Sequence, residues 1–348
     1  MKKIGVLLGF VFTLFASCSS PDEVYVAPNS LLEFDVPSNF PRAKYDLSTN
    51  PPTQLGFELG KKLFYDGRLS ANGFISCGFC HEQKFAFTHH GHQFSHGIDD
   101  LEGIRNTPAI QNAAFMQEFT WDGATAHLDL FPIIPITNEV EMGETVSNVL
   151  AKLQADTEYP ELFANAFEEG EINNEYFLKA LSQFMIMMVS ANSKYDKYIR
   201  QEPGGKLSTL EAEGLAIFQE KCAACHSSDL FTDGTFRNNG LTPNPQINDI
   251  GRAEVSGALS DNYKFKVPSL RNVALTEPYM HDGRFGSLMA VLDFYEQGVS
   301  DSPTLDPLLN KNGQLGIALT NYEKTALVAF LNTLTDETYI NDERFAEY

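Results

Sequence analysis

Apolar residues recur with a helical period in several stretches of the chain, and these stretches predict its main elements. The first places four residues on one face of a helix: Leu55, Leu59, Leu63 and Phe64. The same period runs through residues 175–200 and predicts one long amphipathic helix. Its apolar side consists of Phe177, Leu178, Leu181, Phe184, Met185 and Met188. Methionines at this spacing are usually packing residues, although they can also bind haem iron.

The second half of the chain carries clear helix signals as well. Ser208 followed by Glu211 is a capping box, and it predicts a helix that begins there. Two further helices are predicted, one near residues 288–297 and one over residues 321–334. Between the halves, the Pro- and Gly-containing run 201–205 is the best domain boundary. We therefore predict a mainly α protein with two domains.

The N-terminal residues have the pattern of an export signal. Lys2 and Lys3 precede an apolar run, residues 5–16, that is too short for a typical spanning helix. The run ends in a sequence that resembles a bacterial lipobox, Phe15-Ala16-Ser17-Cys18. We predict that residues 1–18 are a lipoprotein signal peptide whose Cys18 becomes lipidated; ordinary cleavage, leaving a free thiol, is the alternative. The protein is then periplasmic and contacts the membrane only through this anchor.

The residues that follow the signal have no sustained period. Residues 19–52 are rich in Pro, Ser, Asn and Asp, and this composition predicts a tether between the lipid and the folded body. The chain of 348 residues is long enough for about two domains after this segment. Its hydrophobic content of 43% is sufficient for ordinary globular cores.

The net charge of −21 excludes some partners. It argues against binding to nucleic acid or, through charge, to an anionic membrane. It suits a basic partner, such as a small cationic electron-transfer protein. A solvated acidic surface without a partner is the plainer interpretation.

One cysteine motif occurs twice. C-x-x-C-H is the covalent attachment site of a c-type haem, with two thioether bonds and a histidine below the iron. The two copies are Cys77-Gly78-Phe79-Cys80-His81 and Cys222-Ala223-Ala224-Cys225-His226. Zinc or dithiol chemistry is the alternative, but the second copy has no further ligands nearby. The fifth cysteine is Cys18, so none remains for a disulfide, and we predict two covalently bound haem c groups.

Other short motifs lie around these two sites in a fixed order. They are Gly60–Ser70, Arg105-Asn106-Thr107-Pro108, Trp121-Asp122-Gly123, Asn138–Gly143, Phe231-Thr232-Asp233-Gly234, Phe265–Asn272 and Pro278–Gly283. From about residue 53 to 337, the chain resembles the bacterial di-haem cytochrome c peroxidase/MauG family. The resemblance implies two cytochrome c-like domains that face each other, each with one haem. Residues 53–203 would carry the peroxide-reacting haem and residues 204–348 the electron-transfer haem.

The resemblance also implies roles for residues near the first haem. Glu141 matches the family's distal glutamate, which moves a proton between the two peroxide oxygens, and Pro135 shapes the same pocket. Trp121, twenty positions before Glu141, matches an electron relay between the haems. Without the resemblance, Glu141 would be interpreted as a surface residue and Trp121 as a core residue. Among several loop histidines, His96 is our choice for a ligand that caps the first iron at rest; solvated histidines or an unrelated metal site are the alternatives.

The second haem departs from the usual family pattern. His226 is its expected proximal ligand, and many relatives have a Met fourteen positions after the His-Asp-Gly histidine as the sixth ligand. Counting from His281 gives Tyr295, and MauG looks to have a tyrosine ligand at this place. A phenolate favours higher oxidation states of iron than a thioether does. Met280 is the competing ligand, and a helix-surface role for Tyr295 is the third alternative.

Family members also hold a calcium ion between the domains. Asn106 matches its side-chain ligand, and Thr276 and Pro278 match its backbone-carbonyl ligands. Oxygen donors of this kind suit calcium. The alternative is that these residues only shape turns.

The sequence thus leads to one main functional hypothesis and two rivals. The first is a di-haem peroxidase that reduces hydrogen peroxide with electrons from a small donor such as a cytochrome c. The second is a MauG-like enzyme that uses peroxide to oxidise residues of a partner protein. The third is an electron carrier without catalysis. A homodimer is compatible with all three.

Overall fold

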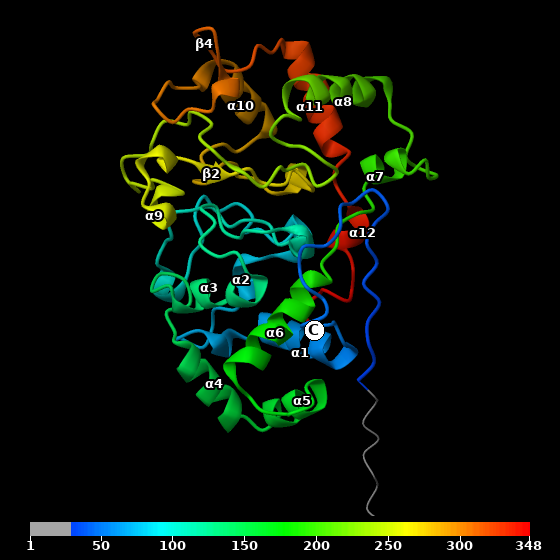
Figure 1. The fold of residues 1–348 in the computed structure, drawn as a ribbon, viewed down its shortest axis with the longest axis vertical. Helices are drawn as coiled ribbons and strands as arrows, with labels where there is room; N and C mark the ends of the chain where they lie inside the picture. Colours follow the sequence, from blue (N-terminus) through cyan, green and yellow to red (C-terminus); the bar gives the residue numbers. More distant parts are fainter. Residues whose placement is uncertain (1–28) are drawn as a thin grey trace, which may run out of the picture.

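The structure, a computed structural model, describes residues 29–348 and is mainly helical (Figure 1). The helices are α1 Gln54–Phe64, α2 Cys77–Cys80, α3 Ile133–Thr137, α4 Val146–Ala155, α5 Tyr159–Ala166, α6 Asn174–Ile186, α7 Lys194–Ile199, α8 Thr209–Lys221, α9 Ala253–Ser256, α10 Leu288–Asp293, α11 Asn321–Asn332 and α12 Glu337–Ile340. Two short antiparallel pairs complete it: β1 Phe236–Arg237 with β2 Phe265–Lys266, and β3 Asn310–Lys311 with β4 Gln314–Leu315. Within the described residues, no helix combines the length and the apolar character needed to cross a bilayer. Cys18 and the predicted signal lie outside this range.

The first lobe is built on the packing of α1 against α6, in the lower half of Figure 1. Thr53 caps α1 by accepting a hydrogen bond from the backbone of Gly56. The predicted apolar face is confirmed, because Leu59, Leu63 and Phe64 are buried in the core. The helices approach closely at Gly60, where an added Cβ would lie 2.0 Å from the carbonyl oxygen of Ala180. Only glycine permits this contact between the two helices.

The second lobe repeats this arrangement with α8 and α11. The predicted capping box of Ser208 and Glu211 is present at the start of α8. Gly214 faces the carbonyl oxygen of Ala326, and an added Cβ would again lie 2.0 Å away. In each lobe a phenylalanine four positions after that alanine packs in the core, Phe184 in one lobe and Phe330 in the other. The loose repeat that the sequence indicated is therefore a repeat of helix packing.

The prediction of one long helix over residues 175–200 is wrong, because the structure has two helices with a break between them. α6 ends at Ile186, and α7 begins after Ser193, which forms its own capping box with Asp196. The intervening backbone bonds to other segments instead: Asn112 Oδ1 accepts from the Ser190 N–H at 2.9 Å, and Asp336 Oδ2 accepts from the Asn192 N–H at 2.8 Å. These tertiary partners replace the helical hydrogen bonds. The predicted packing role of Met185 and Met188 agrees with their burial in the core.

Two segments cross between the lobes and alter the predicted organisation. Residues 29–52 do not hang free as a tether; they run along one side of the molecule (Figure 1), with Phe40 buried against Phe115. At the other end of the chain, Tyr339, Ile340 and Phe345 pack into the core of the first lobe. Tyr195 of α7 belongs to the core of the second lobe, so the packing changes lobes before the predicted boundary at residue 203.

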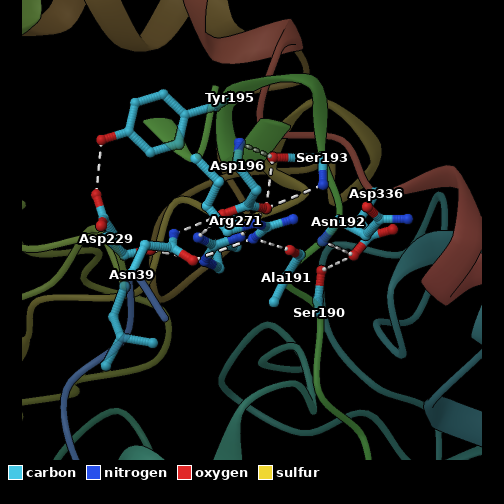
Figure 2. Close-up of polar contacts among 12 residues, drawn as sticks. Asn39, Ser190, Ala191, Asn192, Ser193, Tyr195, Asp196, Asp229, Arg271 and Asp336 are labelled. Atoms are coloured by element: carbon cyan, nitrogen blue, oxygen red, sulfur yellow. Dashed lines mark hydrogen bonds and ion pairs between the residues drawn. The ribbon is translucent and has the colours of Figure 1, made fainter. Parts of the chain in front are cut away.

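A buried ion pair joins the crossing segments (Figure 2). Arg271 donates to both carboxylate oxygens of Asp196 at 2.7 and 2.9 Å, and both side chains are fully buried. Asn39, in the N-terminal segment, donates to the same carboxylate at 3.0 Å. The Arg271 guanidinium also lies 4.4 Å from the centre of the Phe40 ring. The ion pair therefore ties the N-terminal segment, α7 and the second lobe together.

Candidate functional site

The first C-x-x-C-H motif forms the short helix α2. Ser76 caps this helix, and His81 follows it with a ring that is partly buried. Nδ1 of His81 donates to the carbonyl oxygen of Phe87 at 2.7 Å. Burial lowers the pKa of His81 to about 4, so the imidazole is neutral at neutral pH. With Nδ1 protonated and bonded, Nε2 keeps the lone pair that a metal ligand requires.

The second motif has the same arrangement at His226. Its Nδ1 donates to the carbonyl oxygen of Phe231 at 3.1 Å, and burial lowers its pKa. Phe87 and Phe231 both have left-handed backbones, with φ of 61° and 54°. Such a conformation is costly for a bulky residue and persists only where surrounding contacts fix it. At Phe231, those contacts include Arg271, whose Nε donates to the carbonyl of nearby Asp229 at 2.7 Å.

Both motifs offer the side chains that covalently bound haem requires, and the second motif also borders a cavity. The four cysteines are free thiols, since no disulfide joins them. A cavity of about 1230 Å³ lies between the lobes and is lined by Cys222, Cys225 and His226. A neutral imidazole with a free Nε2 and two adjacent thiols is the donor set that haem c needs.

Glu141 lies beside the first motif. Its Oε1 accepts from the amide of Asn138 at 2.7 Å, and its backbone carbonyl accepts from the N–H of Ile98 at 2.8 Å. Burial raises its pKa, an effect that the Asn138 hydrogen bond and the charge of Arg105 partly offset. Cys80 Sγ lies 3.6 Å from the carbonyl oxygen of His96, two residues before Ile98, so Glu141 and the first motif border the same loop. The predicted neighbour Pro135, in α3, accepts from the N–H of Met142 at 3.2 Å.

Trp121 lies between the two halves of the site. Its indole N–H donates to the carbonyl of Asn106 at 2.8 Å, and its ring lines the cavity that holds His226. The Asn106 amide donates to the carbonyl of His92 at 3.1 Å, in the loop beside the first motif. The Asn106 N–H donates to the carbonyl of His281 at 2.7 Å, in the second lobe. Trp121 and Asn106 thus connect the two motifs physically.

His96, the predicted resting ligand, adjoins the first motif, because its carbonyl oxygen lies 3.6 Å from Cys80 Sγ. Its two ring nitrogens face carboxylates, Asp100 at 2.9 Å and Glu102 at 3.4 Å. His89 is the buried histidine of this loop, and its Nδ1 has no hydrogen-bond partner among the described residues. Burial and the neighbouring histidines, His81 among them, lower the pKa of His89 to about 4. His89, whose ring centre lies 6.0 Å from that of Phe79 in the first motif, is a second candidate beside His96.

Both candidate ligands of the second haem line the same cavity. Tyr295 lies in a π-helical turn, Phe294–Gly298, which directly follows α10. Such turns are frequent at functional sites because they re-aim one side chain. Burial raises the pKa of Tyr295 to about 12. The sulfur of Met280 accepts a hydrogen bond from the Asn239 amide at 3.6 Å. A hydrogen bond with Asn239 also lowers the pKa of Tyr295, which partly offsets the effect of burial. Both residues therefore remain candidate ligands.

The three predicted calcium ligands, Asn106, Thr276 and Pro278, border the same large cavity between the lobes. The Asn106 amide nitrogen donates hydrogen bonds to the backbone carbonyls of His92 and Gln93. Its side-chain oxygen is therefore the atom that can bind a cation. Over residues 29–348, no cluster of three or more His, Cys, Asp or Glu side chains has metal-binding geometry. A site built from amide and carbonyl oxygens is not of that type.

Sequence reasoning missed two groups that shape the site. The ring of His281 stacks on Phe265 at 3.7 Å, and burial lowers its pKa to about 4. Arg105 bonds Asp249 at 2.7 Å and Asp122 at 2.5 Å, which fixes the turn after Trp121. His281 and Arg105 belong to two of the short motifs named in the sequence analysis, and membership of these motifs was the only sequence feature that pointed to them.

Comparison with known proteins gives consistent relatives. A family model described as di-haem cytochrome c peroxidase matches residues 54–204. The methylamine utilization protein MauG of Methylorubrum extorquens is 36% identical over 312 residues, covering 87% of this chain and 84% of that protein. The cytochrome c551 peroxidase of Nitrosomonas europaea is 32% identical over 291 residues, covering 80% of each. Among solved structures, a MauG-like protein associated with microbial copper homeostasis has a TM-score of 0.80 and 33% identity, covering 90% of this chain and 99% of that chain.

Proposed function

The chain belongs to the di-haem cytochrome c peroxidase family, and from this premise we propose that it reduces hydrogen peroxide to water with electrons from a small donor protein. The family includes peroxidases and MauG-like enzymes, and membership implies two haem c groups. The observation that carries the proposal is that Glu141 and Cys80 border the same loop, residues 96–98, with Trp121 and Asn106 linking that region to the cavity of His226. We place the reaction in the periplasm, following the predicted signal.

The haem at Cys77 and Cys80 would supply an open iron position for peroxide, with His81 as its proximal ligand. Glu141 takes a proton from one peroxide oxygen and delivers it to the other, so that water leaves rather than hydroxide. Its raised pKa, caused mainly by burial, makes the carboxylate a stronger base than an exposed one, so it takes the first proton more readily. Trp121 shortens the path of electrons from the second site. Two electrons and two protons convert one peroxide into two waters.

The test is steady-state turnover by the protein with both haems attached. Hydrogen peroxide and a reduced cytochrome c or dye are mixed with the enzyme, and oxidation of the donor is recorded. We expect sustained turnover with two electrons consumed per peroxide. A fully loaded protein that shows no turnover with any reduced donor contradicts the proposal.

We also propose a calcium ion at Asn106, Thr276 and Pro278, between the lobes. The proposal is supported by their shared position at the cavity and by the oxygen donors that they offer. Removal of calcium with a chelator should lower peroxide turnover and the midpoint of thermal unfolding, because Asn106 holds Trp121 and the histidine loop. Added calcium should restore both, whereas magnesium should not. An unchanged protein after chelation, with no calcium in elemental analysis, rules the ion out.

One observation favours a second function, the oxidation of residues on a partner protein. Tyr295 lies where ordinary family peroxidases have methionine, and the MauG of Methylorubrum extorquens is 36% identical to this chain. If Tyr295 binds the second iron, Tyr295→Met should raise the midpoint potential of that centre, because thioether sulfur favours Fe(II). Met280→Leu should leave the potential unchanged. The reverse pattern in a spectroelectrochemical titration would identify Met280 as the ligand and remove the support for this function.

A further inference from the structure

One cation inside the cavity between the lobes has no counter-charge. Five basic residues line this cavity: Lys44, Lys221, Arg237, Lys266 and Arg271. Three of them are paired with acids at 2.5–2.7 Å: Lys221 with Glu323, Arg237 with Asp233 and Asp306, and Arg271 with Asp196 as Figure 2 shows. Lys44 is exposed to solvent. Lys266 is the remaining one: it is half-buried at the cavity wall and, among the described residues, has no ion pair or side-chain hydrogen bond.

The backbone fixes Lys266 at the centre of the site. It lies on β2, where its N–H donates to the carbonyl of Trp121 at 2.7 Å, and it stands opposite Phe236 of β1. The charge of Glu118 raises the pKa of Lys266, but the carboxylate of Glu118 forms its ion pair with Arg252 at 3.3 Å. Burial lowers the pKa of Lys266 to about 8, so the ammonium form still predominates at neutral pH. A half-buried cation at a cavity wall, without an ion-pair partner, is placed to pair with an anionic group that enters the cavity.

We propose that Lys266 binds a carboxylate of the porphyrin attached at Cys222 and Cys225, and that its positive charge raises the reduction potential of this second centre. Haem carries two carboxylates, and this cavity is the one that the second motif lines. A cation close to the haem favours the reduced state of the iron, because reduction removes one positive charge from it. The inference depends on the haem itself and not on which substrate the enzyme oxidises.

The test is a spectroelectrochemical titration of the loaded protein. Lys266→Met keeps the length of the side chain and removes only the charge, so we expect normal folding and haem content. At fixed applied potential, the ferric-to-ferrous ratio of the second centre should rise by about tenfold, a fall of ~59 mV for a one-electron couple. The first centre should shift much less. Lys266→Arg should keep the wild-type value, because the charge is retained.

The matched control is Lys264→Gln, two positions away, where the lysine pairs with Asp261 at 3.2 Å near the surface. This variant should leave both potentials unchanged. The proposal is overturned if Lys266→Met has the wild-type potential at the second centre, or if Lys266→Arg shifts it as much as Lys266→Met does. Peroxide turnover is measured on the same samples. An enzyme without turnover that still shows the shift contradicts the proposed function and leaves the role of Lys266 supported.

Discussion

Replacement of Glu141 with Gln should lower the rate of the reaction with peroxide by about 10²–10⁴-fold, the usual contribution of a positioned acid–base group. Gln keeps the shape of the side chain and can still bond Asn138, but it cannot carry the proton between the two oxygens. The measurement is the second-order rate of peroxide consumption by the loaded protein in a stopped-flow instrument. Absorption spectra recorded beforehand should match the wild type, since no haem contact is removed.

The pH profile adds a second readout for the same residue. The carboxylate is the form that accepts the proton, so the wild-type rate should rise with pH through the pKa of Glu141, which burial places above the ordinary value of 4.5. This acid limb should be absent from Glu141→Gln. Glu139→Gln is the matched control, because Glu139 is exposed in the same loop. If Glu141→Gln reacts at the wild-type rate, the chain is an electron carrier or uses another base.

Asp196→Asn should lower the free energy of unfolding by about 3–5 kcal/mol, the cost of leaving a buried charge without its partner. The substitution keeps the volume of the side chain but leaves the fully buried Arg271 uncompensated (Figure 2). Urea titration followed by far-UV circular dichroism measures the effect. Glu158→Gln is the control: its ion pair with Lys62 is largely exposed, and its loss should cost no more than about 1 kcal/mol.

Two further results distinguish the ion pair from simple packing. The double variant Asp196→Leu, Arg271→Met removes both charges and should recover most of the lost stability. Burial alone would raise the pKa of Asp196, but Arg271 more than offsets this and lowers it below the ordinary value of 3.8. The wild-type contribution is therefore complete above about pH 4 and is lost as the pH falls through the lowered pKa. A loss below 1 kcal/mol in Asp196→Asn would show that the pair contributes little.

The helix signals in the sequence predicted the fold well where local rules decide it. The capping box at Ser208 and the apolar face around Leu63 both correspond to observed helices. Ser193 and Asp196 form a capping box of the same kind. The sequence analysis did not detect that a helix begins there, because apolar residues continue with a helical period on both sides of Ser193. The bonds that end α6 come from Asn112 and Asp336, which are far away in sequence. Periodicity carries no information about such partners.

The candidate site shows the same division. Each motif indicated its own residues, and in the structure Glu141 and Cys80 border the same loop while Trp121 lines the cavity of His226. The sequence could not show that residues 29–52 pack against the two lobes. A polar composition is compatible with a free tether and equally with an extended segment that packs on the protein surface. Nor could it identify Lys266, since a cation is conspicuous only when the carboxylates around it are known. These features depend on three-dimensional neighbours.

The central claim is that two porphyrins are bonded to this chain, one at each C-x-x-C-H motif. Intact-mass spectrometry of protein matured in a bacterium with cytochrome c assembly tests it most directly. We expect the mass of the processed chain plus two haem groups, with one haem on the peptide of Cys77 and Cys80 and one on that of Cys222 and Cys225. A chain with unmodified thiols, or with haem at only one motif, would contradict it.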